Sequence, residues 1–333
     1  MILFDEPYVS PELIDYAAAR REPVLDNAVA RDLSRARALS GAEPLNLVPE
    51  AEFAALCRAG GAGTEPPRIY TCSENSLAWV CEHVDNPQLV GSIEKLKNKA
   101  LTRELLRPLY GDYFYRRLSL DALRVLPFEE LRLPCVVKPS VGFFSLGVRI
   151  VRDRADWQAA LAVIEHEAAS WREQYPDSVV DSEDWLIEEY IDGDEYAVDV
   201  YFDAQGRAVI CNILRHEFAS ASDVSDRLYY TGASVVRAHL AEFEGWFNRV
   251  NALLGLRNFP AHVELRRHAS GRILPIEFNP LRFAGWCSTD VSLFAWGFHS
   301  YGCFLEGVKP DWNSILKGRE GRLYTLMALG KPA

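Results

Sequence analysis

Two glutamates and an asparagine are spaced so that a hairpin would bring their side chains together. Glu277 and Asn279 are two positions apart, so both side chains leave the same face of a strand. Glu264 lies on the preceding strand, and the compact turn between the strands is expected to bring it opposite them. Apolar residues flank both glutamates, and no cationic side chain is expected on that face. Burying two carboxylates in this way is costly unless something positive lies between them.

The oxygens of these three side chains are hard ligands, which favour Mg²⁺ in proteins. We therefore predict that Glu264, Glu277 and Asn279 bind one or two Mg²⁺ ions, with Mn²⁺ as a substitute. Arg282 follows three residues after Asn279, beyond a proline, so the chain turns and presents a guanidinium nearby. The alternative is that the three residues are exposed polar positions on an amphipathic hairpin.

A lysine at the end of a strand precedes a glycine-flanked loop. The segment Val136–Pro139 contains Lys138, and the loop runs from Gly142 to Gly147. The backbone N–H groups of such a loop can point at a polyphosphate, while the lysine supplies a positive charge. The loop is not a Walker motif, because valine and arginine follow Gly147 where that motif has lysine and serine or threonine. The alternative is an ordinary hairpin turn with a surface lysine.

Two further segments have residues that suit a nucleotide. Ile187–Glu195 is an apolar strand that runs into a carboxylate-rich bend, where the backbone can pair with a base and a carboxylate can accept hydrogen bonds from ribose hydroxyls. Asn98–Arg103 lies on a predicted helix, from which Lys99 can reach a phosphate. Taken alone, the first segment is also typical of a solvated strand end, and the second of a solvated helix face.

The elements that must position these groups follow from hydrophobic periodicity and from turn residues. Residues 1 to about 92 are predicted to form a small α/β unit, with helices opened by Ser10–Pro11 and after Pro49 and a short strand at Arg68–Cys72. Ser92 is expected to cap a helix that runs to about Leu106.

The rest of the chain is predicted to be α+β and rich in hairpins. The expected strands are Leu133–Val137, Val148–Val151, Trp185–Ile191, Tyr196–Phe202, Arg207–Leu214, Ala261–Arg267 and Ile273–Phe278. The expected helices run from a cap at Asp153 to about Trp171 and from about His239 to Leu254.

Composition argues against several classes of function. The 333 residues include 36 basic and 47 acidic side chains, a net charge of -11 without a basic block, which argues against a nucleic-acid partner. The N-terminus lacks the pattern of a signal peptide, and no apolar run reaches the roughly 18 residues that a membrane helix needs. The seven cysteines are scattered without a CxxC pair, as is typical of reduced thiols. We expect a cytoplasmic protein that is a monomer or a homodimer and has no membrane partner.

Four motifs occur in an order that resembles the ATP-grasp superfamily. They are Asn98–Arg103, Val137–Pro139 with its glycine loop, Ile187–Ile191 with Glu195, and Glu264 with Ile276–Pro280. Glu195 is seven residues after Glu188, Glu277 is thirteen after Glu264, and Asn279 is two after Glu277. Each motif alone is weakly specific, whereas the ordered set is specific. The resemblance covers about Ser92 to Trp286 and is to the carboxylate–amine ligases of the superfamily.

The resemblance implies an α+β fold in which a nucleotide is held between two α+β subdomains. It implies a Rossmann-like N-terminal domain over residues 1–92, a central subdomain with the glycine-rich loop over 93–185, and a C-terminal subdomain with the metal site over 186–333. Three departures are visible: Leu281 separates Pro280 from Arg282, the loop carries two phenylalanines where small residues are common, and Asn98 precedes Lys99 where the family usually has aspartate.

The resemblance also implies a role for each matching residue. ATP phosphates would be held by Lys99 and Lys138 under a loop that contains Gly142, Phe143, Phe144, Ser145 and Gly147. The adenine slot would be lined by Glu188, Glu189, Tyr190 and Ile191, with Glu188 facing the amino group and the backbone near Ile191 pairing with the ring. The ribose would be held by Glu195. The Mg²⁺ ligands would be Glu264, Glu277 and Asn279, and the catalytic residues would be Arg282 and Lys138. Apart from the resemblance, Arg215 follows a predicted strand and is a further catalytic candidate, which would stabilise the oxyanion together with Arg282.

The implied activity is an ATP-dependent ligase that joins a small-molecule carboxylate to an amine, or to a thiol, through an acyl phosphate and releases ADP and phosphate. Two alternatives stay open. One is a carboxylase-type or phosphate-transferring relative, for which phosphate release would not depend on an added amine. The other is a non-catalytic ATP-binding regulator, which the presence of Lys138 and of all three candidate metal ligands argues against.

Overall fold

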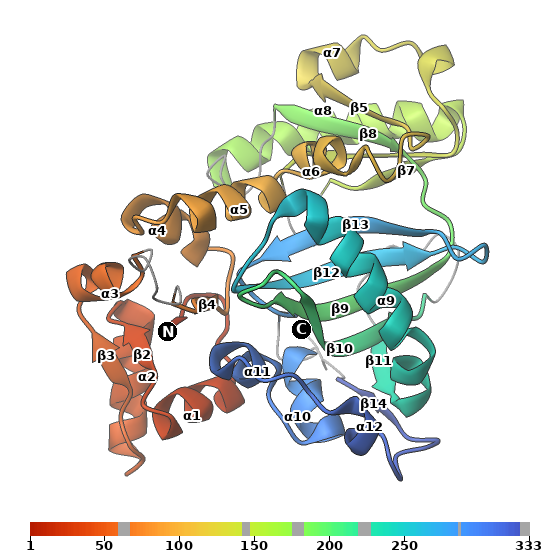
Figure 1. The fold of residues 1–333 in the computed structure, drawn as a ribbon. Helices are drawn as coiled ribbons and strands as arrows, with labels where there is room; N and C mark the ends of the chain where they lie inside the picture. Colours follow the sequence, from red (N-terminus) through yellow and green to blue (C-terminus); the bar gives the residue numbers. More distant parts are fainter. Residues whose placement is uncertain (59–66, 142–146, 175–182, 219–227, 286–287, 327–333) are drawn as a thin grey trace, which may run out of the picture.

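The computed structural model arranges the chain in three β-sheets with helices around them (Figure 1). It describes residues 1–58, 67–141, 147–174, 183–218, 228–285 and 288–326. The fold is α+β, as expected from the sequence. Among the residues just given, no helix combines the length and the apolar character that crossing a membrane requires. The six cysteines described are all free.

A four-stranded parallel sheet forms the N-terminal unit, at the lower left of Figure 1. Its strands, in the order β3-β2-β1-β4, are β1 (Ile2–Leu3), β2 (Pro23–Leu25), β3 (Asn46–Val48) and β4 (Tyr70–Thr71). The helices are α1 (Pro11–Ala19), α2 (Ala28–Leu39), α3 (Glu50–Leu56) and α4 (Ser76–His83). The Ser10 hydroxyl accepts a hydrogen bond from the N–H of Leu13 (3.1 Å), which confirms the predicted start of α1.

The single helix expected from Ser92 to Leu106 is in fact two helices, α5 (Pro87–Lys97) and α6 (Lys99–Leu106). Asn98 separates them, because its backbone is extended and its side-chain oxygen accepts a hydrogen bond from the N–H of Leu101 (3.0 Å). Ser92 lies inside α5, so the prediction that it caps the helix is wrong. The break places Lys99 at the first residue of α6.

A four-stranded antiparallel sheet, the small sheet, lies at the top of Figure 1. Its strands, in the order β5-β8-β6-β7, are β5 (Tyr115–Ser119), β6 (Cys135–Pro139), β7 (Arg149–Val151) and β8 (Asp184–Glu189). Beside them are α7 (Leu120–Arg124), the short 3-10 helix η1 (Phe128–Glu130) and α8 (Arg154–Gln174). The small sheet therefore extends to Glu189, four residues beyond the subdomain boundary expected at 185.

A six-stranded antiparallel sheet, the large sheet, forms the centre of the molecule. Its strands, in the order β13-β12-β9-β10-β11-β14, are β9 (Asp194–Phe202), β10 (Ala208–His216), β11 (Tyr229–Gly232), β12 (Phe259–Arg267), β13 (Ile273–Pro280) and β14 (Leu323–Thr325). Its helices are α9 (Ala233–Leu254), η2 (Ser288–Asp290), α10 (Val291–Trp296), α11 (Ser300–Glu306) and α12 (Trp312–Ile315). Helix α9 begins six residues before the His239 start that periodicity suggested, and β11 and β14 were not predicted.

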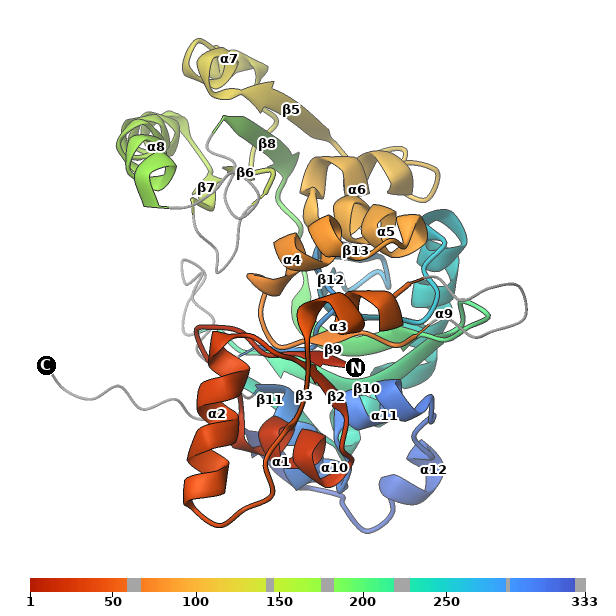
Figure 2. The same cartoon turned by 90° about the vertical axis from the view of Figure 1, so that its left-hand side faces the viewer.

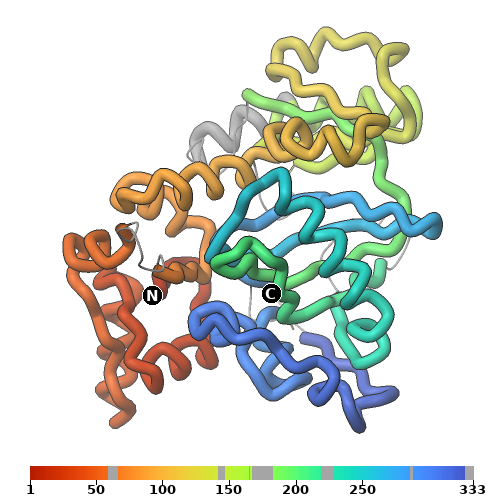
Figure 3. Tube along the Cα trace, in the orientation of Figure 1, coloured from red at the N-terminus to blue at the C-terminus, as the bar shows by residue number. Residues whose placement is uncertain are grey.

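Helix α9 covers one face of the large sheet, and α5 contacts its edge strand β13. Helix α9 packs on one face, where the Tyr196 hydroxyl and the His239 ring nitrogen lie 2.9 Å apart and where Phe243 and Phe247 enter the main hydrophobic core. Helix α5 packs against β13, and the small sheet lies beyond α5 and α6 in both views (Figures 1 and 2). Figure 3 traces the chain from the N-terminal unit through α4, α5 and α6 into the small sheet, and then through β8 and β9 into the large sheet. The segment that contains Lys99 is therefore placed between the two sheets.

Candidate functional site

The three expected metal ligands lie together on one face of the large sheet. Glu264 on β12 pairs directly with Glu277 on β13, and Asn279 is two residues further along β13. Directly paired residues of antiparallel strands project to the same face, so all three side chains share it. Val263 and Phe278 form the pair between them and enter the hydrophobic core from the other face. The sequence therefore predicted the convergence correctly, while metal binding itself remains a prediction.

A cation that was not expected lies beside these carboxylates. The Lys99 ammonium, at the start of α6, forms an ion pair of 2.9 Å with Oε2 of Glu277. The expectation that no cationic side chain reaches this face is wrong, because a residue 178 positions earlier in the chain contacts it through tertiary packing. The side chains of both residues are largely buried, with 10% and 17% of their surface exposed.

The pair is charged on both sides. Burial alone would raise the pKa of Glu277, but the charge of Lys99 and its hydrogen bond outweigh burial and hold this pKa below its usual value. Burial likewise disfavours the charged form of Lys99, yet the attraction of Glu277 raises the pKa of the lysine. Asn279 contributes its amide N–H, which donates to Oε1 of Glu277 at 3.3 Å. Two carboxylates thus share a buried face with an ammonium held between the two sheets.

Lys138, at the end of β6, also pairs with a glutamate. Its ammonium bonds Oε1 of Glu188 on β8, and Arg103 of α6 donates from Nε to Oε2 of the same carboxylate at 2.8 Å. Burial would raise the pKa of Glu188, but the charges of Arg103 and Lys138 lower it to about 2. For Lys138, burial outweighs the attraction of Glu188, so the pKa of the lysine is lowered. The structure thus gives Glu188 two cationic partners where the resemblance implied an adenine amino group.

Arg103 also joins the two sheets. Its Nη2 donates to the carbonyl oxygen of Ile276 on β13 at 3.1 Å, so one guanidinium contacts both Glu188 in the small sheet and the strand of the candidate metal site. The main chain is tied in a similar way, because the N–H of Lys99 donates to the carbonyl oxygen of Ser140, just after β6. These contacts fix Lys99 and Lys138 on the same side of the Glu264–Glu277 pair.

Arg282 reaches the site through an unusual turn. Leu281 has φ 61°, a left-handed conformation that is rare for a leucine and is held here by backbone hydrogen bonds to Pro260 and Thr71. The turn directs Nη2 of Arg282 to Oδ1 of Asn279 at 3.0 Å. The residue that separates Pro280 from Arg282 therefore does not remove the guanidinium from the site.

Glu74 is a site residue that sequence analysis missed. Its carboxylate, between β4 and α4 of the N-terminal unit, accepts a hydrogen bond from Nη2 of Arg282 at 2.9 Å and pairs with Lys97. Burial would raise the pKa of Glu74, but Lys97 and Arg282 lower it to about 2. No spacing in the sequence links a glutamate in a loop to an arginine 208 residues later. Glu74 therefore fixes the orientation of Arg282 from a different part of the chain.

Replacing Glu74 by glutamine is expected to lower the free energy of unfolding by about 2–3 kcal/mol, because two buried cations lose their counter-charge. Urea unfolding followed by circular dichroism measures the change. Glu82→Gln, on the exposed side of α4, is the matched control and should change stability by less than about 0.5 kcal/mol. A loss in E74Q no greater than in E82Q would show that the carboxylate does not hold Arg282.

The residues expected around the adenine and ribose form a second cluster. Glu195 on β9 lies 2.8 Å from Nδ1 of His216 and accepts a hydrogen bond from Nε of Arg266 at 2.9 Å. Arg266 also donates to the carbonyl oxygen of Ile191 (2.7 Å) and lies over the Tyr190 ring at 5.1 Å. Glu189 instead turns toward β5 and accepts from the N–H of Phe114 at 3.1 Å. The cluster lies at the connection between the small sheet and the large sheet.

Arg215 does not lie beside Arg282. On β10, Arg215 pairs with Tyr196 of β9, whose side chain contacts α9. The next pair along these strands, Leu214 and Ala197, is the one that lies in register with Glu264. Because side chains alternate along a strand, Arg215 projects from the face opposite the candidate metal site. Its partners there are Asp194 and Glu217 at the surface. Arg215, expected among the catalytic residues, therefore does not join Arg282 at the candidate metal site.

The expected phosphate loop falls largely outside the described residues. Gly142, Phe143, Phe144 and Ser145 are not described, and Gly147 is described with φ 74°, a conformation that favours glycine. Strands β6 and β7 on either side of the loop form the predicted antiparallel pair. The role of the loop remains a prediction.

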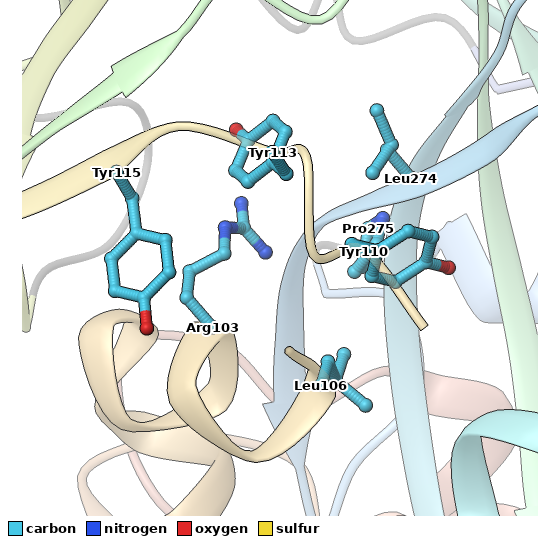
Figure 4. Close-up of a pocket in the computed structure, with 7 residues that line it drawn as sticks. All are labelled: Arg103, Leu106, Tyr110, Tyr113, Tyr115, Leu274 and Pro275. Atoms are coloured by element: carbon cyan, nitrogen blue, oxygen red, sulfur yellow. The ribbon is translucent and has the colours of Figure 1, made fainter. Parts of the chain in front are cut away.

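A small pocket lies behind Arg103, between α6, the segment before β5, and β13 (Figure 4). The guanidinium lies 5.4 Å from the centre of the Tyr113 ring, and Tyr110, Tyr115, Leu106, Leu274 and Pro275 complete the lining. Tyr113 and Leu274 pack with Ile191 in a separate hydrophobic cluster. This cluster supports the connection between the sheets at Ile191.

The described residues contain no group of three or more histidine, cysteine, aspartate or glutamate side chains placed to hold a metal ion. The candidate site has two carboxylates and one amide, so further oxygens for an ion would have to come from water or from a bound phosphate. The donor set still fits Mg²⁺, because all three side chains offer hard oxygen atoms on one face of the sheet.

Known proteins resemble this chain in sequence and in fold. Residues 131–290 match the sequence model of a family described as the ATP-grasp domain. An uncharacterized protein of Sinorhizobium fredii (strain NBRC 101917 / NGR234), y4rH, is 27% identical over 290 residues, which cover 83% of this chain and 52% of that protein. The chain therefore spans about half the length of this curated relative.

Three solved structures illustrate the similarity of fold. An L-amino acid ligase from Bacillus licheniformis has a TM-score of 0.64 at 18% identity, over 98% of this chain and 75% of that one. The biotin carboxylase domain of the Hydrogenobacter thermophilus 2-oxoglutarate carboxylase, solved with MgADP, ADP and bicarbonate, has a TM-score of 0.60 at 13% identity over 93% and 70%. An N5-carboxyaminoimidazole synthase from Aspergillus clavatus, solved with ADP and 5-aminoimidazole ribonucleotide, has a TM-score of 0.58 at 15% identity over 94% and 78%.

The sequence motifs, the two sheets that face one another across α6 and these comparisons agree. Residues 131–290 match the ATP-grasp domain model, and the chain shares the fold of these solved structures, in agreement with the fold that its motifs predicted.

Proposed function

We propose that this protein is an ATP- and Mg²⁺-dependent ligase that converts a small-molecule carboxylate to an acyl phosphate and joins it to an amine. The observation that carries the proposal is the Glu264–Glu277 pair on one face of the large sheet, with Asn279 beside it and Lys99 in contact with Glu277. The start of α6, which holds Lys99, is hydrogen-bonded to the end of the strand that carries Lys138. Two carboxylates, an amide oxygen and two lysines on one side suit a magnesium triphosphate.

The nucleotide would lie between the two sheets. The carbonyl oxygen of Ile191 is occupied by Arg266, whereas its N–H has no hydrogen bond within the described chain and is free to pair with a ring nitrogen of adenine. Glu195 would hold the ribose with its remaining lone pairs, since Arg266 and His216 occupy one direction of each oxygen. Lys138 and Lys99 would then contact the phosphates.

Glu264, Glu277 and Asn279 would hold the Mg²⁺. The ion, when bound, would polarise the phosphate oxygens and offset their negative charge. Lys138 would offset the negative charge that remains on the phosphate oxygens. Arg282, which Glu74 and Asn279 hold in position, would bind the carboxylate that reacts.

The reaction would proceed in two displacements. A carboxylate oxygen of the first substrate attacks the γ-phosphorus, and ADP leaves with the electrons of the broken P–O bond. The amine nitrogen of the second substrate then attacks the acyl carbon, phosphate leaves, and the amine gives up a proton as the amide forms. Arg282 would stabilise the oxyanion formed in this second step, because its guanidinium is largely buried, charged and fixed by oxygens of Glu74, Asn279 and Phe283.

The experiment that tests the proposal is a screen of the 20 common amino acids, singly and in pairs, for release of phosphate from ATP in the presence of Mg²⁺. An amino acid pair that releases phosphate and forms a dipeptide would support the ligase. Hydroxylamine added with one amino acid should yield a hydroxamate, since hydroxylamine attacks acyl phosphates directly. If nucleotide binds but neither a panel of amino acids nor one of small carboxylates releases phosphate, the proposal is wrong and a regulator is favoured.

A carboxylase is the second candidate, because two of the similar folds belong to a biotin carboxylase domain and an N5-carboxyaminoimidazole synthase. Such an enzyme would release phosphate with bicarbonate as the carboxylate. Phosphate release that needs bicarbonate and does not rise with any added amine would favour it over the amide-forming ligase.

A further inference from the structure

We infer that Lys99 holds the place of the divalent cation in the nucleotide-free protein, so that this site binds metal tightly only when a nucleotide triphosphate draws the lysine away. The inference rests on the proposed function for the identity of the nucleotide. If Lys99 were only a phosphate ligand, its position would not make the affinity for the metal depend on the nucleotide. Here we infer that it does.

The position of Lys99 is fixed at its main chain. It is the first residue of α6, its N–H donates to the carbonyl oxygen of Ser140 at 3.0 Å, and Asn98 caps the helix. Only the side chain can therefore move by much. In the structure it extends to Oε2 of Glu277, and its charge also acts on Glu264, the strand partner of Glu277. The ammonium thus lies where a cation shared by the two glutamates would lie.

The charges explain why a free metal ion would bind poorly. A divalent ion entering alongside Lys99 would lie close to an ammonium, with the guanidinium of Arg282 on the other side of Asn279. Repulsion between like charges a few ångströms apart is strong at a largely buried site. A triphosphate changes the balance, because it offers Lys99 new anionic oxygens and brings further ligands for the ion. By linkage, nucleotide and metal must then increase each other's affinity by the same factor.

Lys138 provides the matched comparison. It belongs to the same site and is similarly buried, but its ammonium is paired with Glu188 in the small sheet, and it acts on Glu277 only through the smaller effect of its charge. Removing its charge should change nucleotide affinity while leaving the Glu264–Glu277 pair occupied by Lys99. Comparing variants of the two lysines therefore distinguishes the effect of losing any positive charge in the site from the effect of freeing the Glu264–Glu277 pair of its ammonium.

The experiment measures Mn²⁺ binding to the full chain by electron paramagnetic resonance, with and without the non-hydrolysable β,γ-imido analogue of ATP. For the wild type, we expect weak Mn²⁺ binding without the analogue and binding at least about tenfold tighter with it. Lys99→Met should bind Mn²⁺ about tenfold more tightly than the wild type in the absence of nucleotide, because one like charge has been removed. Lys138→Met should stay within about threefold of the wild type under that condition, and Lys99→Arg, which keeps the charge, should also remain weak.

The inference is overturned if the wild type binds Mn²⁺ equally well with and without the analogue, or if K99M gains no more than K138M. If K99M does not fold, Lys99→Gln takes its place, because phosphate ligands alone would also make Mn²⁺ binding by the wild type depend on the analogue. No Mn²⁺ binding under any condition would overturn the inference and the metal assignment together. Mn²⁺ binding that is coupled to the analogue, without phosphate release on any substrate panel, would instead support the inference and contradict the proposed ligase activity.

Discussion

Replacing Glu277 by glutamine and Asn279 by alanine is expected to lower ATP turnover by about a thousandfold or more, because both changes remove oxygen ligands from one cation. Glu277→Gln keeps the shape of the side chain and an acceptor for Lys99, so the loss should come from charge and coordination rather than from packing. The measurement is ADP formation with the substrate pair that releases phosphate in the screen, at saturating ATP and Mg²⁺.

Stability has to be measured on the same double variant. Glu320→Gln, at an exposed ion pair with Arg237, is the control and should retain wild-type turnover. If the E277Q/N279A protein is folded and its turnover stays within about tenfold of the wild type, these two side chains do not bind the metal that catalysis requires.

Replacing Glu188 by glutamine is expected to cost about 3–5 kcal/mol in the free energy of unfolding, because Arg103 and Lys138 would be buried without their counter-charge. Urea unfolding at neutral pH measures the loss. Glu130→Gln, which removes the partner of Arg116 at the surface, should cost less than about 1 kcal/mol. A similar small loss in both variants would contradict the view that Glu188 neutralises this part of the site.

Because the pKa of Glu188 is lowered by folding, we expect the free energy of unfolding to depend on pH. The pKa of Glu188 falls from an ordinary 4.5 to about 2 in the folded protein, so its contribution is complete above pH 4.5 and is lost as the pH falls toward 2. The difference corresponds to about 3 kcal/mol. Between pH 4.5 and pH 2, the free energy of unfolding of the wild type should therefore fall by about 3 kcal/mol more than that of the E188Q protein. Equal losses in the two proteins would show that Glu188 is not held in its charged form.

The local part of the site could be predicted from the sequence. The hairpin of β12 and β13 follows from alternating residues around a short turn, and the positions of Glu264, Glu277 and Asn279 within it set which face they share. The strand that carries Lys138 and its return through β7 were predictable for the same reason. These features depend only on residues that are close in the chain.

The contacts that complete the site could not be predicted in this way. Lys99 reaches Glu277 only because Asn98 ends α5 and turns α6 toward the large sheet, and that break was read as a continuous helix. Glu74 reaches Arg282 only because β4 lies beside the turn at Leu281. Arg215 was expected beside Arg282, but the face from which it projects depends on the register of β10 against β9. Each of these depends on packing between distant segments, on which local patterns give no information.

The most direct test of the whole account is a crystal structure of the protein with Mg²⁺ and the β,γ-imido analogue of ATP. We expect at least one ion at about 2.0–2.1 Å from carboxylate oxygens of Glu264 and Glu277, with phosphate oxygens completing its shell and with Lys99 turned from Glu277 to the phosphates. An ion bound elsewhere, or a triphosphate that lies away from Lys138 and this hairpin, would contradict it.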